Sequence, residues 1–431
     1  MKFWNRRRKQ QFIYILVDMI SSILIWGAFL IFRWLVYEGR ILSVDSVLIP
    51  MFNFYIPLFL YPIVCIVIYY LSGYYLRPLR KRYLREFRRT LVSSLIITFV
   101  SFFSIIIDDP VVDYRHYFTS LCVLFTLQFF GAYIPRLIVT YISHKAENDT
   151  PRTYTIHSMD EVETFEQLHA IEPYDDVILD FASKSKETDI YTLINRLYPL
   201  NVEISVVPSL YDMLTGAAMI EKVTDQPLIH ITEHKMSDTE LCIKRAFDIV
   251  VSLLMLVLLL PVYVVVALVV WFTSEGPIFY KQERIGLHGI PFNIIKFRTM
   301  YVHAEQAIPQ LSEDNDPRVT RVGKWLRKYR IDELPQFWNV LRGEMSIVGP
   351  RPERRYFINQ IEEKAPYYCM IYKIRPGLTS WGPIKVGYTD TLEKMVRRLN
   401  FDIVYIENMS IQLDIEIMFY TIGVIFNGKG K

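Results

Sequence analysis

Five long apolar runs decide what this chain can fold into. They cover residues 12–32, 48–71, 91–107, 117–142 and 249–272, and each contains at most one charged residue. A helix that crosses a bilayer needs ~20 apolar residues, with a range of about 17–25. Hydrophobic residues make up 52% of the 431 residues, more than the ~45–50% of ordinary soluble domains. The sequence therefore predicts a membrane protein.

Basic residues flank these runs unevenly. The first ten residues hold Lys2, Arg6, Arg7, Arg8 and Lys9, and residues 77–89 hold seven more Lys and Arg. The segment between the third and fourth runs is acidic. Because basic loops stay in the cytoplasm, we expect a cytoplasmic N-terminus and four spans that return the chain to the cytoplasm near residue 143. A net charge of only +3 argues against nucleic acid as a partner.

The chain becomes polar between the fourth and fifth runs. Residues 176–180 and 202–208 have the pattern of short buried strands, and Ile190, Leu193, Ile194 and Leu197 between them have helical spacing. Strand, helix and strand in this order predict a small parallel α/β unit of Rossmann-like type. It lacks a Gly-x-Gly-x-x-Gly fingerprint, so we expect a structural or regulatory role.

The fifth run has a proline, Pro261, at its centre. Twenty-four helical residues would extend ~36 Å, enough to cross a bilayer. A proline lacks the backbone donor and kinks or breaks a helix, so the alternative is a re-entrant hairpin that enters and leaves on one side. The composition of the run alone favours a plain fifth span.

The C-terminal part carries the candidate catalytic groups. Residues 292–300 are typical of a strand that places Lys296 and Arg298 on one face, where two cations suit phosphate binding. Further along, Leu334, Phe337, Trp338 and Leu341 predict a helix that Gly343 ends.

Asp332 and Glu333 stand where that helix begins. In one interpretation Asp332 is only its N-cap. In the other, one carboxylate attacks phosphorus and the pair holds Mg²⁺; adjacency alone leaves open which carboxylate attacks. Three arginines strengthen the second interpretation, since arginine suits bidentate phosphate recognition and stiff turns hold two of them. They are Arg327, Arg351 in Gly-Pro-Arg-Pro, and Arg375 in Arg-Pro-Gly.

Five motifs in this order resemble the polyprenyl-phosphate hexose-1-phosphate transferases, the monotopic phosphoglycosyl transferases that begin bacterial glycan assembly. They are KRAFDIVVSLLMLVLLLP, GPIFYKQERIG, IKFRTM, RIDELPQFWNVLRGEMSIVGPRP and RPGLTSWG. The resemblance covers about residues 242–426. The segment 380–387, SWGPIKVG, departs from the family pattern, which leaves the sugar open. The sequence also does not give the glycan pathway or the oligomeric state, for which a homodimer is one candidate.

The resemblance implies a transfer of sugar 1-phosphate from a UDP-sugar to undecaprenyl phosphate, with Mg²⁺ and release of UMP. Asp332 would be the nucleophile and Glu333 its partner near the metal, while Arg327, Arg351, Arg375 and Lys296 match motif positions. Pro261 would match the break of a re-entrant membrane helix, so the fifth run would not cross the bilayer. The chain would be a multi-pass protein of the bacterial inner membrane, with a cytoplasmic catalytic domain.

We therefore expect three domains. A four-helix transmembrane region covers residues 1–145, a cytoplasmic α/β domain covers 146–238, and an α+β catalytic domain covers 239–431, with a re-entrant helix at about 247–272. One alternative is a membrane-anchored nucleotide-sugar dehydratase or epimerase, although its Tyr-x-x-x-Lys motif matches best at Tyr141–Lys145, at a membrane exit. Another is a non-enzymatic sensor or export partner, in which Asp332 is a replaceable cap.

Overall fold

The computed structural model describes residues 2–33, 35–36, 50–76, 83–108, 114–145, 152–180, 187–200, 202–208, 229–231, 236–302, 316–387 and 391–426. The chain divides into two compact units: Met1–Pro151 with Asp238–Ile243, and Arg152–Ser237 with Lys244–Lys431. Residues 77–82 and 109–113, which belong to the loops used to predict orientation, lie outside the described residues.

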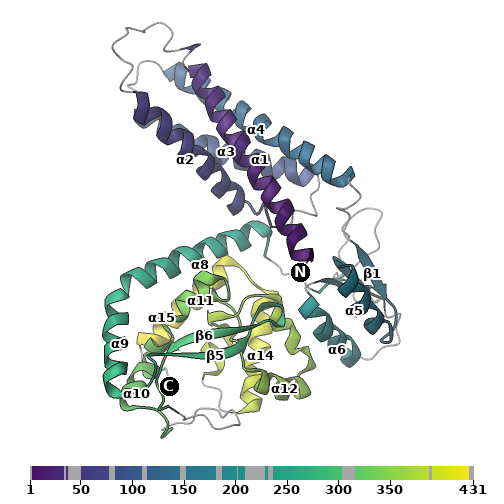
Figure 1. The fold of residues 1–431 in the computed structure, drawn as a ribbon, viewed down its shortest axis with the longest axis vertical. Coiled ribbons are helices and arrows are strands. Elements are labelled where there is room, and N and C mark those ends of the chain that lie inside the picture. Colours follow the sequence, from purple (N-terminus) through teal and green to yellow (C-terminus); the bar gives the residue numbers. More distant parts are fainter. Residues whose placement is uncertain are drawn as a thin grey trace. The chain divides into compact units, whose positions relative to one another are not determined.

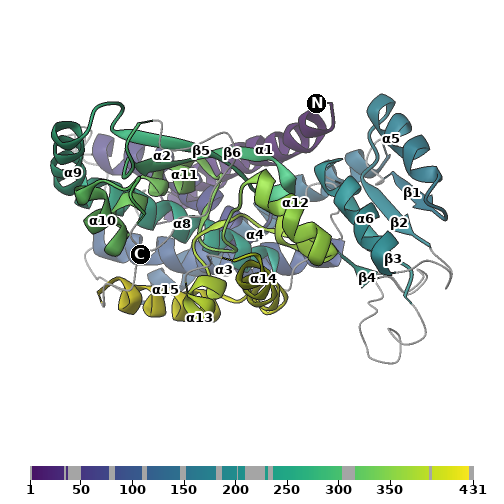
Figure 2. The same ribbon diagram turned by 90° about the horizontal axis from the view of Figure 1, so that it is seen from below.

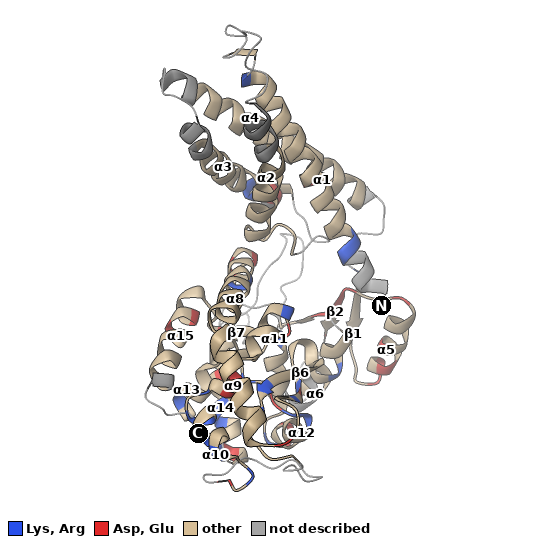
Figure 3. Cartoon of the chain, turned by 60° about the vertical axis from the view of Figure 1, so that its left-hand side comes forward, with Lys and Arg blue, Asp and Glu red and all other residues tan. Residues whose placement is uncertain are grey.

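Four helices make up most of the first unit and coincide with the first four apolar runs. They are α1 (Lys2–Arg33), α2 (Pro50–Leu71), α3 (Tyr83–Asp108) and α4 (Tyr114–Lys145). Helix α1 packs against α2 and α4, and α3 packs against α4 (Figure 1). Among the described residues, Arg8–Arg33 and Phe118–Ser143 are long and apolar enough to cross a membrane, and Leu58–Leu71 is a shorter apolar helix. The apolar runs within these helices carry few charges (Figure 3).

A buried ion pair lies inside this helical unit. Arg136 Nε and Nη2 donate to the two carboxylate oxygens of Asp18 at 2.7 and 2.8 Å, and both side chains are at most 1% exposed. The guanidinium lies between the rings of Tyr69 and Tyr74, 3.7 and 3.9 Å from their centroids. Tyr75 Oη also donates to Asp18 at 2.6 Å. The charges are therefore paired and hydrogen-bonded, as burial of an ion requires.

The middle segment forms a four-stranded sheet with the order β1-β2-β3-β4. Strands β1 (Thr153–Ile156), β2 (Asp176–Leu179) and β3 (Glu203–Val206) are parallel, and β4 (Ile229–His230) is antiparallel to β3. Helices α5 (Glu161–Ile171) and α6 (Glu187–Leu197) connect the parallel strands (Figure 2). The predicted strand–helix–strand unit over residues 176–208 is confirmed. A short 3₁₀ helix, η3 (Tyr198–Leu200), follows α6.

The fifth apolar run is bent rather than straight. Helix α8 (Asp238–Leu258) and helix α9 (Leu260–Thr273) meet at 61°. Pro261 lies in the first turn of α9, where its missing N–H is tolerated but cannot extend α8. The predicted break at Pro261 is therefore confirmed, whereas the side of the membrane on which α9 ends is not set by the bend.

The remaining elements form a mixed α/β domain. Strands β5 (Phe279–Ile285) and β6 (Pro291–Phe297) form an antiparallel hairpin, and β7 (Ser346–Val348) pairs in parallel with β8 (Gly377–Thr379). Buried residues Val266, Val270, Phe297 and Leu326 join α9 to this domain. The helices are η4 (Leu287–Gly289), α10 (Arg321–Lys328), η5 (Ile331–Glu333), α11 (Gln336–Arg342), α12 (Arg355–Lys364), η6 (Pro366–Lys373), α13 (Trp381–Val386), α14 (Leu392–Glu407) and α15 (Ile411–Phe426).

Candidate active site

The two adjacent carboxylates lie in the 3₁₀ turn η5, not at the start of a single helix. Arg330, in the left-handed region at φ 54°, precedes this turn. The side chain of Asp332 makes no capping bond, and α11 begins only at Gln336, after Pro335. The interpretation of Asp332 as an N-cap is therefore wrong, because the left-handed residue reverses the chain two positions earlier. The predicted helix end at Gly343 is confirmed by its φ of 83°.

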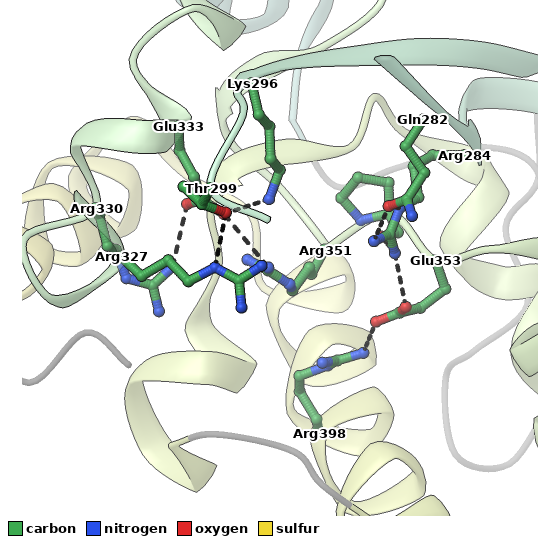
Figure 4. Close-up of polar contacts among 11 residues, drawn as sticks. Gln282, Arg284, Lys296, Thr299, Arg327, Arg330, Glu333, Arg351, Glu353 and Arg398 are labelled. Carbon is green, nitrogen blue, oxygen red and sulfur yellow. Dashed lines mark hydrogen bonds and ion pairs between the residues drawn. The ribbon is translucent and has the colours of Figure 1, made fainter. Parts of the chain in front are cut away.

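Three cations bind the carboxylate of Glu333. Lys296 Nζ donates to Oε1 at 2.7 Å, Arg351 Nη2 approaches the same oxygen at 3.4 Å, and Arg330 Nη1 lies 3.2 Å from Oε2 (Figure 4). Lys296 comes from β6, Arg351 from the turn after β7, and Arg330 from the left-handed corner before η5. Residues far apart in the sequence thus converge on one buried carboxylate.

This clustering sets the charge of Glu333 and Lys296. Burial opposes ionisation of Glu333, but Lys296, Arg351 and Arg330 outweigh it and hold the pKa of Glu333 well below its usual range. Burial lowers the pKa of Lys296, and Glu333 counteracts part of that effect. Glu333 is therefore an anion over the physiological pH range, with both oxygens engaged.

Asp332 differs from its neighbour in both contacts and acidity. Its side chain is 7% exposed, and within the described ranges it has no hydrogen-bond or ion-pair partner. Burial, and then the nearby Glu333 carboxylate, raise the pKa of Asp332. A more basic carboxylate with unengaged oxygens is the better nucleophile of the pair. The geometry thus separates two residues that adjacency alone left equivalent.

The other predicted phosphate-binding residues, Arg327, Arg298 and Arg375, form hydrogen bonds with residues other than Glu333. Arg327 Nε donates to Thr299 Oγ1 at 2.9 Å, beside the Glu333 cluster (Figure 4). Arg298 lies just beyond β6, and its Nη2 donates to the Ser274 carbonyl at 2.6 Å, at the end of α9. Arg375 Nε donates to the Gly343 carbonyl at 2.9 Å, at the end of α11. Lys296, Arg327 and Arg351 therefore gather around the carboxylate pair, whereas the contacts of Arg298 and Arg375 support the backbone.

A second ion cluster, absent from the sequence-based prediction, adjoins the first. Glu353 accepts from Arg284 Nη1 at 3.0 Å and from Arg398 Nη2, both beside Arg351 in Figure 4. Two residues before it, the backbone of Arg351 hydrogen-bonds to Asp402 of α14. Glu353 is in the Gly-Pro-Arg-Pro-Glu run, and this closeness to Arg351 was the one feature of the sequence that could have assigned it to the site. No comparable feature marks its distant partners Arg284 and Arg398.

Asp402 connects the turn that carries Arg351 to α13. Its carboxylate also accepts from Ser380 Oγ and from the Gly382 N–H, the latter at 3.1 Å. Burial raises the pKa of Asp402 to about 6, even though Arg398 and these hydrogen bonds favour the anion. The aspartate thus connects the backbone of Arg351 to the start of α13.

The bent helix pair is hydrogen-bonded directly to the segment that carries the two carboxylates. Tyr263 Oη, on α9, donates to the carbonyl of Leu334 at 2.8 Å. Leu334 follows Glu333, so this bond holds the end of η5 against α9. On α8, Arg245 donates to the carbonyls of Val340 and Leu341 at 2.7 and 3.0 Å, at the end of α11. Both ends of the segment that carries the carboxylates are therefore attached to the bent pair.

Comparison with known proteins identifies the family. A family model described as bacterial sugar transferase matches residues 239–428. The exopolysaccharide production protein ExoY of Sinorhizobium fredii is 37% identical over 203 residues, which cover 44% of this chain and 87% of that protein. The chain belongs to the bacterial sugar transferase family. The matched residues include every member of the Glu333 cluster.

Two longer relatives of this bacterial sugar transferase match over part of their length. UDP-glucose:undecaprenyl-phosphate glucose-1-phosphate transferase of Escherichia coli K12 is 38% identical over 232 residues, 53% of this chain and 50% of that protein. UDP-N-acetylgalactosamine-undecaprenyl-phosphate N-acetylgalactosaminephosphotransferase of Aeromonas hydrophila is 35% identical over 257 residues, 60% of each chain. The chain thus spans about half to three fifths of these relatives, whose named sugars differ.

The bacterial sugar transferase offers few ligands for a metal ion. Within the described residues, no group of three or more His, Cys, Asp or Glu side chains could hold one. Mg²⁺ commonly takes only one or two carboxylates, and its remaining ligands are water and substrate phosphate oxygens. Asp332, whose oxygens are unengaged, and Glu333 meet that minimum. The residues present therefore fit Mg²⁺ only when the substrate completes its coordination.

Proposed function

We propose that this protein transfers sugar 1-phosphate from a UDP-sugar to undecaprenyl phosphate, releasing UMP, as a first membrane step in polysaccharide synthesis. Family membership and the names of the relatives support the reaction class. The observation that carries the mechanism is the contrast between two carboxylates. Asp332 has no side-chain partner among the residues that the structure describes, whereas three cations bind Glu333.

The reaction proceeds in two displacements. A carboxylate oxygen of Asp332 attacks the sugar-bearing phosphorus, the bond between the two phosphates breaks, and UMP leaves with its electron pair. An oxygen of undecaprenyl phosphate then attacks the same phosphorus and displaces Asp332, which returns as a carboxylate. Lys296, Arg327 and Arg351 stabilise charge on the phosphoryl oxygens, and Glu333 holds two of these cations in place. Mg²⁺, bound to Asp332 or Glu333 and the phosphates, would neutralise charge on the diphosphate.

Both substrates must reach Asp332 from one side of the membrane. We propose that α8 and α9 form a re-entrant pair in the bacterial inner membrane, with α1 to α4 as spans and the N-terminus and catalytic domain in the cytoplasm. The 61° bend at Pro261 and the exposed apolar side chains of α9, such as Val265 and Phe272, support this placement. The Rossmann-like character and separate role of the middle segment, the three domain boundaries and the homodimer stay predictions.

The nucleophile is tested by paired substitutions. Membranes containing the protein are incubated with a panel of UDP-sugars and undecaprenyl phosphate, and UMP is quantified. We expect Asp332→Asn to abolish UMP release and to form no phosphosugar adduct when donor alone is added. We expect Glu333→Gln to retain some adduct formation, with release lowered ~10²-fold because the cations lose their anchor. UMP release by Asp332→Asn at the wild-type rate would contradict the assignment.

A further inference from the structure

One buried polar group close in sequence to the carboxylates has no partner within the described part of the chain. Gln336 is 2% exposed, and its Nε2 atom has no hydrogen-bond partner among the described residues. A buried donor without an acceptor costs about 1–3 kcal/mol, and such groups call for an explanation in a native structure. Of the unpaired buried side-chain atoms in the described chain, Gln336 Nε2 alone belongs to the helical stretch from η5 through α11.

The backbone places Gln336 on the side of the carboxylates. Leu334 N–H donates to the Ile331 carbonyl and Phe337 N–H to the Leu334 carbonyl, both at 3.2 Å. These i to i+3 bonds define a 3₁₀ path with three residues per turn, in which residues i and i+3 are eclipsed. Gln336 is three residues after Glu333, so its side chain leaves the backbone one turn along, in the same direction.

The known contacts of Glu333 leave this amide unused. Lys296 and Arg330 bind the two oxygens of Glu333, so the carboxylate's charge is already matched. The Gln336 amide does not join this network, although it is one turn away. A neutral donor that is buried four residues after Asp332 and does not join the ion cluster suits a ligand oxygen that arrives only with substrate.

We propose that Gln336 Nε2 donates a hydrogen bond to a non-bridging oxygen of the phosphoryl group that is transferred at Asp332. The proposal rests on the function proposed above. A phosphoryl oxygen is the acceptor because the transferred phosphorus would be bonded to Asp332, four residues before Gln336. The bond is strongest when negative charge builds on that oxygen during each displacement, so it acts mainly on the rate of transfer.

The test replaces the amide with an apolar group of similar length. In Gln336→Met we expect kcat for UMP release to fall ~10²-fold, the usual effect of removing one preorganised donor, with a smaller change in KM. The same variant should melt at a higher temperature than the wild type, because the unsatisfied buried donor is gone. Gln336→Glu, which offers no donor to a phosphate, should lose at least as much activity.

Matched measurements separate this role from others. Gln360→Met, the same change on α12, should keep wild-type kcat. A lower melting temperature together with lower activity in Gln336→Met would indicate a merely structural glutamine and overturn the proposal, as would wild-type kcat. The loss should be equal for every UDP-sugar used, and a loss confined to one sugar would overturn the phosphoryl assignment. Absence of UMP release from the wild type would instead refute the proposed function, while the melting comparison would still test the unpaired donor.

Discussion

At the scale of single residues, the site depends on how one carboxylate is neutralised. Lys296 Nζ is the nearest partner of Glu333, at 2.7 Å, and both side chains are largely buried. Removing one member of a buried pair leaves an uncompensated charge. Lys296 therefore keeps Glu333 in its place, in addition to the phosphate-binding role proposed above.

Substitution of Lys296 tests this dependence. We expect Lys296→Met to lower UMP release by ~10²-fold or more and to lower the melting temperature of the detergent-extracted protein. Lys296→Arg should recover part of the UMP release and part of the melting temperature, since it restores the positive charge. Lys281→Met, on the exposed side of neighbouring β5, serves as the control. Equal activity of Lys296→Met and Lys281→Met would contradict the role of the pair.

Asp402 predicts a dependence of stability on pH. The carboxyl ionises near pH 3.9 in an unfolded chain and near 6 in the folded protein, so the folded state holds its proton more tightly between these values. The free energy of unfolding therefore falls as pH rises from about 4 to about 6, by about 3 kcal/mol from this group.

Melting curves measure that effect. Between about pH 5 and about pH 7, the melting temperature of Asp402→Asn should rise relative to that of the wild type, because the asparagine does not ionise. The comparison between variants cancels the pH dependence of all other groups. A difference that stays constant over this range would show that the folded Asp402 titrates like an unfolded one.

The sequence predicted the residues at the centre of the site better than their surroundings. Lys296, Arg351 and Glu333 were recognised because a strand, a rigid turn and an acidic pair each had a local pattern. Arg330 was missed because its role depends on a left-handed backbone, which no pattern around a non-glycine residue indicates. Asp402 was missed because its hydrogen-bond partners come from two distant segments, residues 380–382 and Arg351.

At the scale of helices and strands, periodicity and proline were informative. The apolar runs, the strands over residues 176–206 and the break near Pro261 were all predicted from local composition and spacing. The single helix predicted to begin at Asp332 was instead a 3₁₀ turn followed by α11. One continuous helix and a 3₁₀ turn followed by a helix have the same apolar spacing. Only the backbone geometry, which is fixed by packing against α9, distinguishes these two structures.

The topology of the bent pair has a direct test. A protease-cleavable tag after Lys431 should be protected in intact cells, because a re-entrant α8–α9 pair keeps the C-terminal domain in the cytoplasm. A tag inserted at residue 45, between the first two apolar runs, should be cleaved from outside and controls for protease access. Cleavage of the Lys431 tag under conditions that preserve the cells would mean that the fifth run crosses the membrane.

At the scale of the whole molecule, the chain consists of a helical unit and a larger unit that includes the catalytic domain. Composition predicted the apolar helices of the first unit, and motif order predicted the family of the C-terminal part of the second. The ion pair at the core of the helical unit was not predicted, since Asp18 and Arg136 are isolated charges in separate runs. Their pairing depends on how α1 packs against α4, which a single sequence does not reveal.

We expect substitutions of the Asp18–Arg136 ion pair to affect the stability of the helical unit separately from that of the larger unit. Asp18→Asn or Arg136→Met should each destabilise the helical unit, by about 3–5 kcal/mol if the remaining charge stays buried. The exchange Asp18→Arg with Arg136→Asp should recover only part of the lost stability, because Tyr69 and Tyr74 enclose the guanidinium at its present position. Detergent melting and protein yield report the loss, and a full recovery by the exchange would show that the tyrosines contribute little.

The hydroxyl of Tyr263 joins α9 to the carbonyl of Leu334, the residue that follows Glu333. With α9 in lipid as proposed, a change in acyl-chain length that raises or lowers this helix also displaces the turn carrying the nucleophile. Bilayer thickness would then act as a control on turnover without any effector molecule. Cells that remodel their fatty acids would alter the rate of glycan initiation as a mechanical by-product.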